Sequence, residues 1–237
     1  MASGKRRPDR WQAWLQSMAQ RSETADLRRF YEAFPDNPAD PIGTTPLAAI
    51  DLETSGLDPG KHGILSIGVV PFTLNGIATG ASRHWILRPP RGFSGESVAY
   101  HHIRHFDVEQ APDLGEVLPE ILESLRGRLP VVHYHPIERR FLDGAVRERT
   151  GTVFRFPLID TMEIEARRHR RPWRMRLGRL FGRTPASIRL ADSRERYGLP
   201  AYEGHQAVVD AIGTAELLQA QIQHHYSNST PIGDLRV

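Results

Sequence analysis

Two carboxylates two residues apart offer the chemistry of a hard-metal site. Asp51 and Glu53 follow the apolar run 46–50, which is typical of a buried strand. Alternate residues of a strand project from one face, so both acids are predicted to point the same way. Carboxylates this close repel each other unless a cation neutralises them, and their oxygens suit hard divalent ions. The alternative is a solvated turn, because Ser55 and Gly56 come next.

A third acid, Glu138, is predicted to face inward from a helix over 136–149. Apolar residues lie three, four and seven positions after it, namely Phe141, Leu142 and Ala145. These offsets define one helix face, so the glutamate shares the apolar side. A buried carboxylate needs a cation or several hydrogen-bond donors. The neighbouring Arg139 and Arg140 project elsewhere and are poor partners for it.

A histidine and an aspartate, His205 and Asp210, open the last long predicted helix. Five positions apart in a regular helix, they would lie about 140° apart and could not address one point. His205 is therefore predicted to lie in the loop or first turn, where Gly204 gives the backbone freedom. Its imidazole could then reach whatever Asp210 holds. The alternative is an exposed helix start with a capping histidine.

Together these residues predict a phosphodiester-cleaving site. The chain has no cysteine, and oxygen ligands favour Mg²⁺ or Mn²⁺ over zinc. Two such ions about 3.5–4 Å apart can activate water and stabilise the leaving oxygen of a phosphodiester. An imidazole titrates near neutral pH and suits a general base. The predicted catalytic set is Asp51, Glu53, Glu138 and Asp210 as metal ligands, with His205 as the base.

Three segments resemble the DnaQ-like 3′→5′ exonucleases of the DEDDh type, a family that includes the proofreading epsilon subunit of DNA polymerase III, ribonuclease T and oligoribonuclease. The first motif is DLETSGL at 51–57, the second HYHPIE at 133–138, and the third His205 with Asp210. The resemblance covers about residues 46–224. It implies a ribonuclease H-like fold, two Mg²⁺ or Mn²⁺ ions, and release of nucleotides one by one from a 3′ end.

The resemblance also implies roles for individual residues. Asp51, Glu53 and Asp210 would hold the first metal ion, and Asp51 with the second-motif acid would serve the other. Thr54 and Leu57 match positions that contact the terminal nucleotide, with Leu57 as an apolar wedge against its base.

The second motif departs from the family pattern, because Glu138 stands where aspartate is usual. The extra methylene moves the oxygens by about 1.5 Å, and a misplacement of about 1 Å can cost 10²-fold in rate. Either the helix sits farther back or the second ion is bound loosely. Asp143 lies off the inward face and is not expected to substitute. The segment 101–104 reads HHIR where the family tends to have His-Gly-Ile-Thr.

The pattern of elements predicts an α/β fold: a ribonuclease H-like mixed sheet flanked by helices, with an N-terminal helical extension. Asn75–Gly76 marks a turn after the second strand. The strands are predicted at 46–53, 63–72, 82–88, 129–133 and 156–159, and the helices at 10–34, 113–126, 136–149, 186–197 and 205–224.

Three regions are predicted along the chain. Residues 1–45 form a helical extension with a proline-rich linker, 46–226 the exonuclease domain, and 227–237 a flexible tail. The extension is expected to pack on the domain or to dock a polymerase or another protein.

Composition is that of a soluble globular protein of 237 residues, 39% hydrophobic, with net charge +3. No stretch is apolar enough for a signal peptide or membrane span, so we expect no membrane contact and a cytoplasmic location. Eleven arginines fall within 167–196. They either track a polyphosphate backbone or solvate a helical face.

The leading hypothesis is a metal-dependent 3′→5′ exonuclease that acts on 3′ ends of single-stranded DNA or short RNA. The alternative is a catalytically weak or inactive nucleic-acid-binding or polymerase-accessory module with the same fold.

Overall fold

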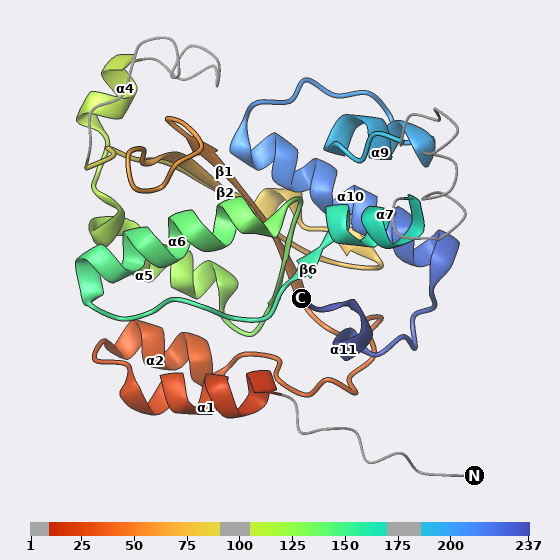
Figure 1. Cartoon of the computed structure of the whole chain (residues 1–237), viewed down its shortest axis with the longest axis horizontal. Helices are drawn as coiled ribbons and strands as arrows, with labels where there is room; N and C mark the ends of the chain where they lie inside the picture. The colour runs from red at the N-terminus through yellow and green to blue at the C-terminus, as the bar shows by residue number, and fades with distance from the viewer. Residues whose placement is uncertain (1–9, 91–104, 170–185) are drawn as a thin grey trace, which may run out of the picture.

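A mixed sheet crosses the middle of the molecule (Figure 1). The computed structural model describes residues 10–90, 105–169 and 186–237. In these ranges the sheet has the strand order β3-β2-β1-β5-β6, with β4 also paired to β2. The strands are β1 (Leu47–Thr54), β2 (Ile64–Thr73), β3 (Gly76–Ile77), β4 (Arg83–Ile86), β5 (Leu129–Val132) and β6 (Ile159–Asp160). The predicted mixed sheet is confirmed.

Strand direction decides which residues meet at the end of β1. Strands β1 and β2 are antiparallel, whereas β5 runs parallel to β1 with Ala49 opposite Val131. Two residues beyond this pair stand Asp51 on β1 and His133 after β5. The first and second motifs therefore emerge at the same edge of the sheet.

Helices cover the sheet on its faces and ends. They are α1 (Arg10–Arg21), α2 (Ala25–Glu32), α4 (His105–Gln110), α5 (Leu114–Leu125), α6 (His135–Thr150), α7 (Thr161–His169), α9 (Leu190–Arg196), α10 (Ala207–His225), α11 (Ile232–Leu235) and the 3₁₀ turn η1 (Thr79–Ala81). Helix α10 packs on β1 and β2, and α5 packs on α6. Helix α9 begins at Leu190, later than predicted, and helices α4, α7 and α11 were not predicted. None of the helices in the described ranges is both long and apolar enough to cross a membrane.

A glycine brings α10 against the sheet. Gly68 of β2 pairs with Asp51, so the two positions share one face of the sheet. A Cβ atom on Gly68 would lie 2.4 Å from the backbone carbonyl carbon of Ala207, the first residue of α10. No side chain fits in that space. Because Gly68 has no side chain, the start of α10 can lie beside Asp51.

The N-terminal helices pack on the rest of the chain, at the lower edge in Figure 1. The Phe30 ring lies 5.4 Å from the Phe154 ring and 5.5 Å from the Phe156 ring, between centroids. The Trp14 indole donates a hydrogen bond of 3.1 Å to the Arg155 carbonyl oxygen. The helical extension is thus part of the main body, the first of the two arrangements expected for it.

The C-terminal segment contradicts the prediction of a flexible tail over 227–237. Ile232 and Leu235 are 0% and 1% exposed, and α11 links them. The Ile232 amide donates to the Asp40 carbonyl oxygen, and the Val237 amide donates to the Leu158 carbonyl oxygen, both at 2.9 Å. Two apolar anchors and backbone hydrogen bonds order a segment whose composition is too polar to predict it.

We predict that Ile232→Ala lowers the free energy of unfolding by about 2–5 kcal/mol, because it leaves a cavity under α11. Chemical denaturation measures the change. Ser229→Ala, at an exposed position of the same segment, is the matched control and should change stability little. Equal stability of both variants and the wild type would mean that the segment does not pack in solution.

Candidate metal-dependent active site

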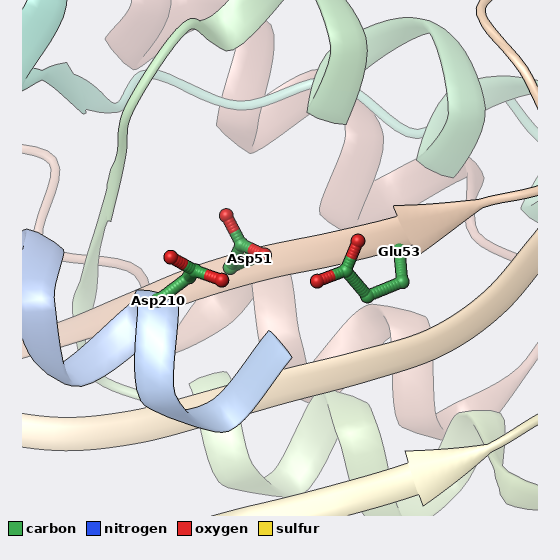
Figure 2. A group of neighbouring side chains, drawn as sticks. All are labelled: Asp51, Glu53 and Asp210. Carbon is green, nitrogen blue, oxygen red and sulfur yellow. The ribbon is translucent and has the colours of Figure 1, made fainter. Parts of the chain in front are cut away.

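Three carboxylates converge where β1 meets the start of α10. Asp51 and Glu53 come from alternate positions of β1, and Asp210 comes from the first turn of α10 (Figure 2). One ligand oxygen from each lies within 4.8 Å of the others. Strand alternation, as predicted, aligns the first two acids, and the Gly68 contact brings in the third.

This convergence is electrostatically costly without a cation. The pKa of Asp51 is raised well above its ordinary value, first by burial and then by the charges of Asp210, Glu53 and Glu138. A divalent ion would remove this penalty by pairing with the ionised carboxylates. The donors are all oxygens, so the set fits a hard ion such as Mg²⁺ or Mn²⁺.

Asp210 is held in place by two donors. The Tyr202 hydroxyl donates to Oδ1 and the backbone N–H of His205 donates to Oδ2, each at 2.7 Å. The Arg194 guanidinium stacks 4.7 Å from the centre of the Tyr202 ring. Arg194 is 3% exposed and donates to the carbonyl oxygens of Pro200 and Gly213, each at 3.0 Å. Sequence reasoning missed Tyr202 and Arg194, because nothing in their spacing marks them.

His205 lies before the helix, as predicted from its spacing to Asp210. Helix α10 begins at Ala207, and His205 has a left-handed backbone with φ of 71°. Its side chain is exposed. The backbone of this residue therefore anchors Asp210 while its imidazole stays on the surface of the site.

Glu138 faces inward but does not join the three converging carboxylates. It is 4% exposed, among Ile50, Val132 and Leu142. Within the described ranges, its Oε2 has no hydrogen-bond partner. Burial raises the pKa of this carboxyl well above its ordinary value. Of the four predicted metal ligands, three therefore converge closely, and the fourth is buried near enough to raise the pKa of Asp51.

Asp143, which was not expected to substitute for Glu138, makes hydrogen bonds elsewhere in the structure. It accepts hydrogen bonds from Arg147 at 3.0 Å, from the Phe154 amide at 2.8 Å and from Arg155 at 3.3 Å. These contacts tie α6 to the segment that leads into β6. Asp143 therefore has a structural role away from the site.

Asp160 at the end of β6 orients the second motif, and sequence reasoning missed it. Its carboxylate accepts from the backbone amides of Tyr134 at 3.1 Å and His135 at 2.9 Å, and from the His135 imidazole at 2.7 Å. Burial would raise the pKa of Asp160, but these hydrogen bonds lower it below its ordinary value. The only sequence signal was an acid directly after the short strand predicted at 156–159.

The two predicted nucleotide contacts lie after the motif acids. The Thr54 hydroxyl donates to the Gly56 carbonyl oxygen at 2.8 Å, which shapes the turn. Leu57 is 80% exposed, as an apolar wedge would have to be. The segment 101–104 and the arginines at 170–185 lie outside the described residues.

Comparisons with known proteins identify the family of this chain. A family model of exonucleases, ribonuclease T, matches residues 48–218. The PolC-type DNA polymerase III of Thermotoga maritima is 28% identical over 176 residues, 74% of this chain and 12% of that protein. The DNA polymerase III subunit epsilon of Rickettsia conorii is 28% identical over 95 residues, 40% of this chain and 41% of that protein. The chain thus spans less than half the length of these curated relatives.

A solved structure shares the fold. The structure of Exonuclease X in complex with 5′ overhanging duplex DNA has a TM-score of 0.59 at 22% sequence identity. The match covers 80% of this chain and 98% of that chain.

We predict that Asp51→Asn stabilises the metal-free protein and removes its response to Mn²⁺. The raised pKa means that ionising Asp51 costs folding free energy, so the metal-free wild type loses stability as pH rises from the ordinary carboxyl range through the raised pKa. An amide cannot ionise, and one pKa unit corresponds to about 1.4 kcal/mol.

Thermal unfolding measures both effects. Mn²⁺ should raise the Tm of the wild type, increasingly at higher pH, and should leave the Tm of Asp51→Asn unchanged. The control is Glu23→Gln, an exposed acid in the connection between α1 and α2, which should keep the wild-type response. A wild type that Mn²⁺ does not stabilise would exclude a metal site here.

Proposed function

Because the chain belongs to the ribonuclease T family of exonucleases, we propose that it is a metal-dependent 3′→5′ exonuclease. Membership confirms the resemblance found in the three motifs. The proposed substrates are 3′ ends of single-stranded DNA or short RNA, released as nucleoside monophosphates. The observation that carries the proposal is the convergence of three carboxylates within 4.8 Å.

The acids are proposed to hold two Mg²⁺ or Mn²⁺ ions. Asp51, Glu53 and Asp210 would bind the first, and Asp51 with Glu138 would bind the second. Ions of this kind, when bound, lower the pKa of water and stabilise the leaving oxygen of a phosphodiester. The Oε2 of Glu138 has no hydrogen-bond partner among the described residues, which supports its part, because a buried carboxylate needs a cation to stay ionised.

The protein's own side chains would orient the substrate and move one proton. A ring nitrogen of His205 would take the proton from the attacking water, which its exposed place beside Asp210 supports. Tyr202 and the His205 backbone amide would keep Asp210 in position. Thr54 and Leu57 would contact the terminal nucleotide, with Leu57 against its base.

A protein partner is also proposed. One of the relatives described above is a PolC-type DNA polymerase III, and another is a DNA polymerase III subunit epsilon. The N-terminal helices use one side to pack on the domain, and the exposed side of α1 would contact a polymerase or another protein.

The alternative, a non-catalytic binding module, is less favoured. Three acids in mutual repulsion, with the Asp51 carboxyl buried enough to raise its pKa, cost stability unless a cation binds. A module that never binds metal would gain nothing from retaining them.

We predict that the wild type shortens a 3′-tailed oligonucleotide in Mn²⁺ and that chelator stops the reaction. Asp210→Ala should lower the rate by at least about 10²-fold, because the first ion loses a ligand, while circular dichroism shows a folded chain. Oligonucleotide retained but never shortened would support the binding module. Parallel DNA and RNA oligomers of several lengths would identify the preferred substrate.

We predict that His205→Ala cuts turnover by about 10²–10⁴-fold, the usual contribution of a general base. The Mn²⁺-induced rise in Tm should stay close to that of the wild type, since the imidazole is not among the converging carboxylates. The loss of turnover should be seen throughout the range from pH 6 to 9. An unchanged rate over that range would refute the role.

A further inference from the structure

Two non-glycine residues in the described part of the chain have a positive φ, and both belong to the motif segments. They are His205, with φ of 71°, and Tyr134, with φ of 92° and ψ of 64°. An L-residue with a bulky side chain is strained in this region. Strain of this kind persists where surrounding contacts enforce it, and it clusters at functional sites.

The backbone of Tyr134 makes two hydrogen bonds that support this conformation. Its amide donates to Asp160 Oδ1 at 3.1 Å, and its carbonyl oxygen accepts from the Ile137 amide at 3.2 Å. On one side, the His133 imidazole bonds Thr161 at 2.8 Å; on the other, His135 bonds Asp160. These contacts would serve any residue at position 134. The hydrogen bonds of the strained turn thus do not involve the aromatic ring.

The Tyr134 ring is nevertheless presented at the surface. The residue is 45% exposed, one of three large hydrophobic residues exposed in the described ranges, together with Leu57 and Phe106. The ring is therefore accessible to a ligand, on a turn whose backbone amides are held by Asp160.

Tyr134 lies at the same edge of the sheet as the three carboxylates. Because β5 is parallel to β1 and pairs Val131 with Ala49, His133 is level with Asp51 and Tyr134 comes one residue later. Leu57 follows the end of β1 at this edge as well. Tyr134 and the proposed terminal-base wedge, Leu57, therefore follow two neighbouring strands at one edge of the sheet.

We propose that Tyr134 forms a stacking subsite for a nucleobase of a single-stranded substrate, upstream of the terminal nucleotide. Aromatic rings stack on every base, so such a subsite selects unpaired strands without reading their sequence. The inference rests on the proposed exonuclease function and narrows it: the protein would prefer 3′ ends whose upstream bases are unpaired.

Two substitutions distinguish a contribution of the Tyr134 ring to binding from a contribution to stability. Tyr134→Asn removes the ring and places a residue that tolerates positive φ better, so it should unfold at the wild-type temperature or above. Tyr134→Phe keeps both the ring and the strain. A loss of binding in the asparagine variant alone could not then arise from a damaged turn.

Two substrates separate stacking from chemistry. Oligothymidine has upstream bases, whereas the 5′-p-nitrophenyl ester of thymidine monophosphate has none. Tyr134→Asn should raise the KM for oligothymidine about tenfold relative to its KM for the ester, within the range known for one stacked base, and Tyr134→Phe should not. An equal change for both substrates, or none for oligothymidine, would overturn the subsite.

Binding gives a second readout that does not need turnover. The binding of 5′-labelled oligothymidine can be measured by fluorescence anisotropy in Ca²⁺. The Kd should be about tenfold higher for Tyr134→Asn than for Tyr134→Phe. Equal Kd values would refute the subsite. A wild type that binds the strand but hydrolyses neither substrate in Mn²⁺ would instead refute the exonuclease proposal, so the two failures are distinct.

Discussion

Mutual repulsion among carboxylates is the constraint on which this structure depends. Asp51, Glu53 and Asp210 hold oxygens within 4.8 Å of one another, and the pKa of Asp51 is raised by burial and by these neighbours. Carboxylates in water would separate. Here a strand fixes two and a helix fixes the third, so the fold must supply the energy that keeps them together until a cation binds. The packing around the site offsets the free-energy cost of holding these carboxylates together.

Two contacts keep the helix from relieving the repulsion. The bare backbone of Gly68 lets the start of α10 lie against β2, and a side chain there would push Asp210 away from Asp51. Tyr202, stacked under the buried Arg194, donates to one oxygen of Asp210. One contact sets the distance of the helix from the sheet, and the other sets the direction of its carboxylate.

Asp160 plays the matching role at the second motif. By accepting from several donors around the start of α6, it fixes both the inward course of Glu138 and the strained backbone of Tyr134. A buried acid that is fully hydrogen-bonded thus supports another, Glu138, whose Oε2 has no partner in the described part of the chain. The first can stay ionised without a cation, whereas the second needs one.

Local sequence patterns were sufficient to predict how several side chains of the site are oriented. Strand alternation aligned Asp51 with Glu53, helical spacing turned Glu138 inward, and the angle between His205 and Asp210 required the histidine to precede the helix; the structure agrees on each. Periodicity carries such information because it depends only on backbone geometry.

Distances between elements were decided by tertiary structure alone. The sequence could not show that Glu138 stays outside the converging carboxylates, that Tyr202 and Asp160 orient the site, or that residues 227–237 pack on the core. Each depends on contacts between residues far apart in the chain, and a one-dimensional pattern holds no measure of how closely two packed elements approach.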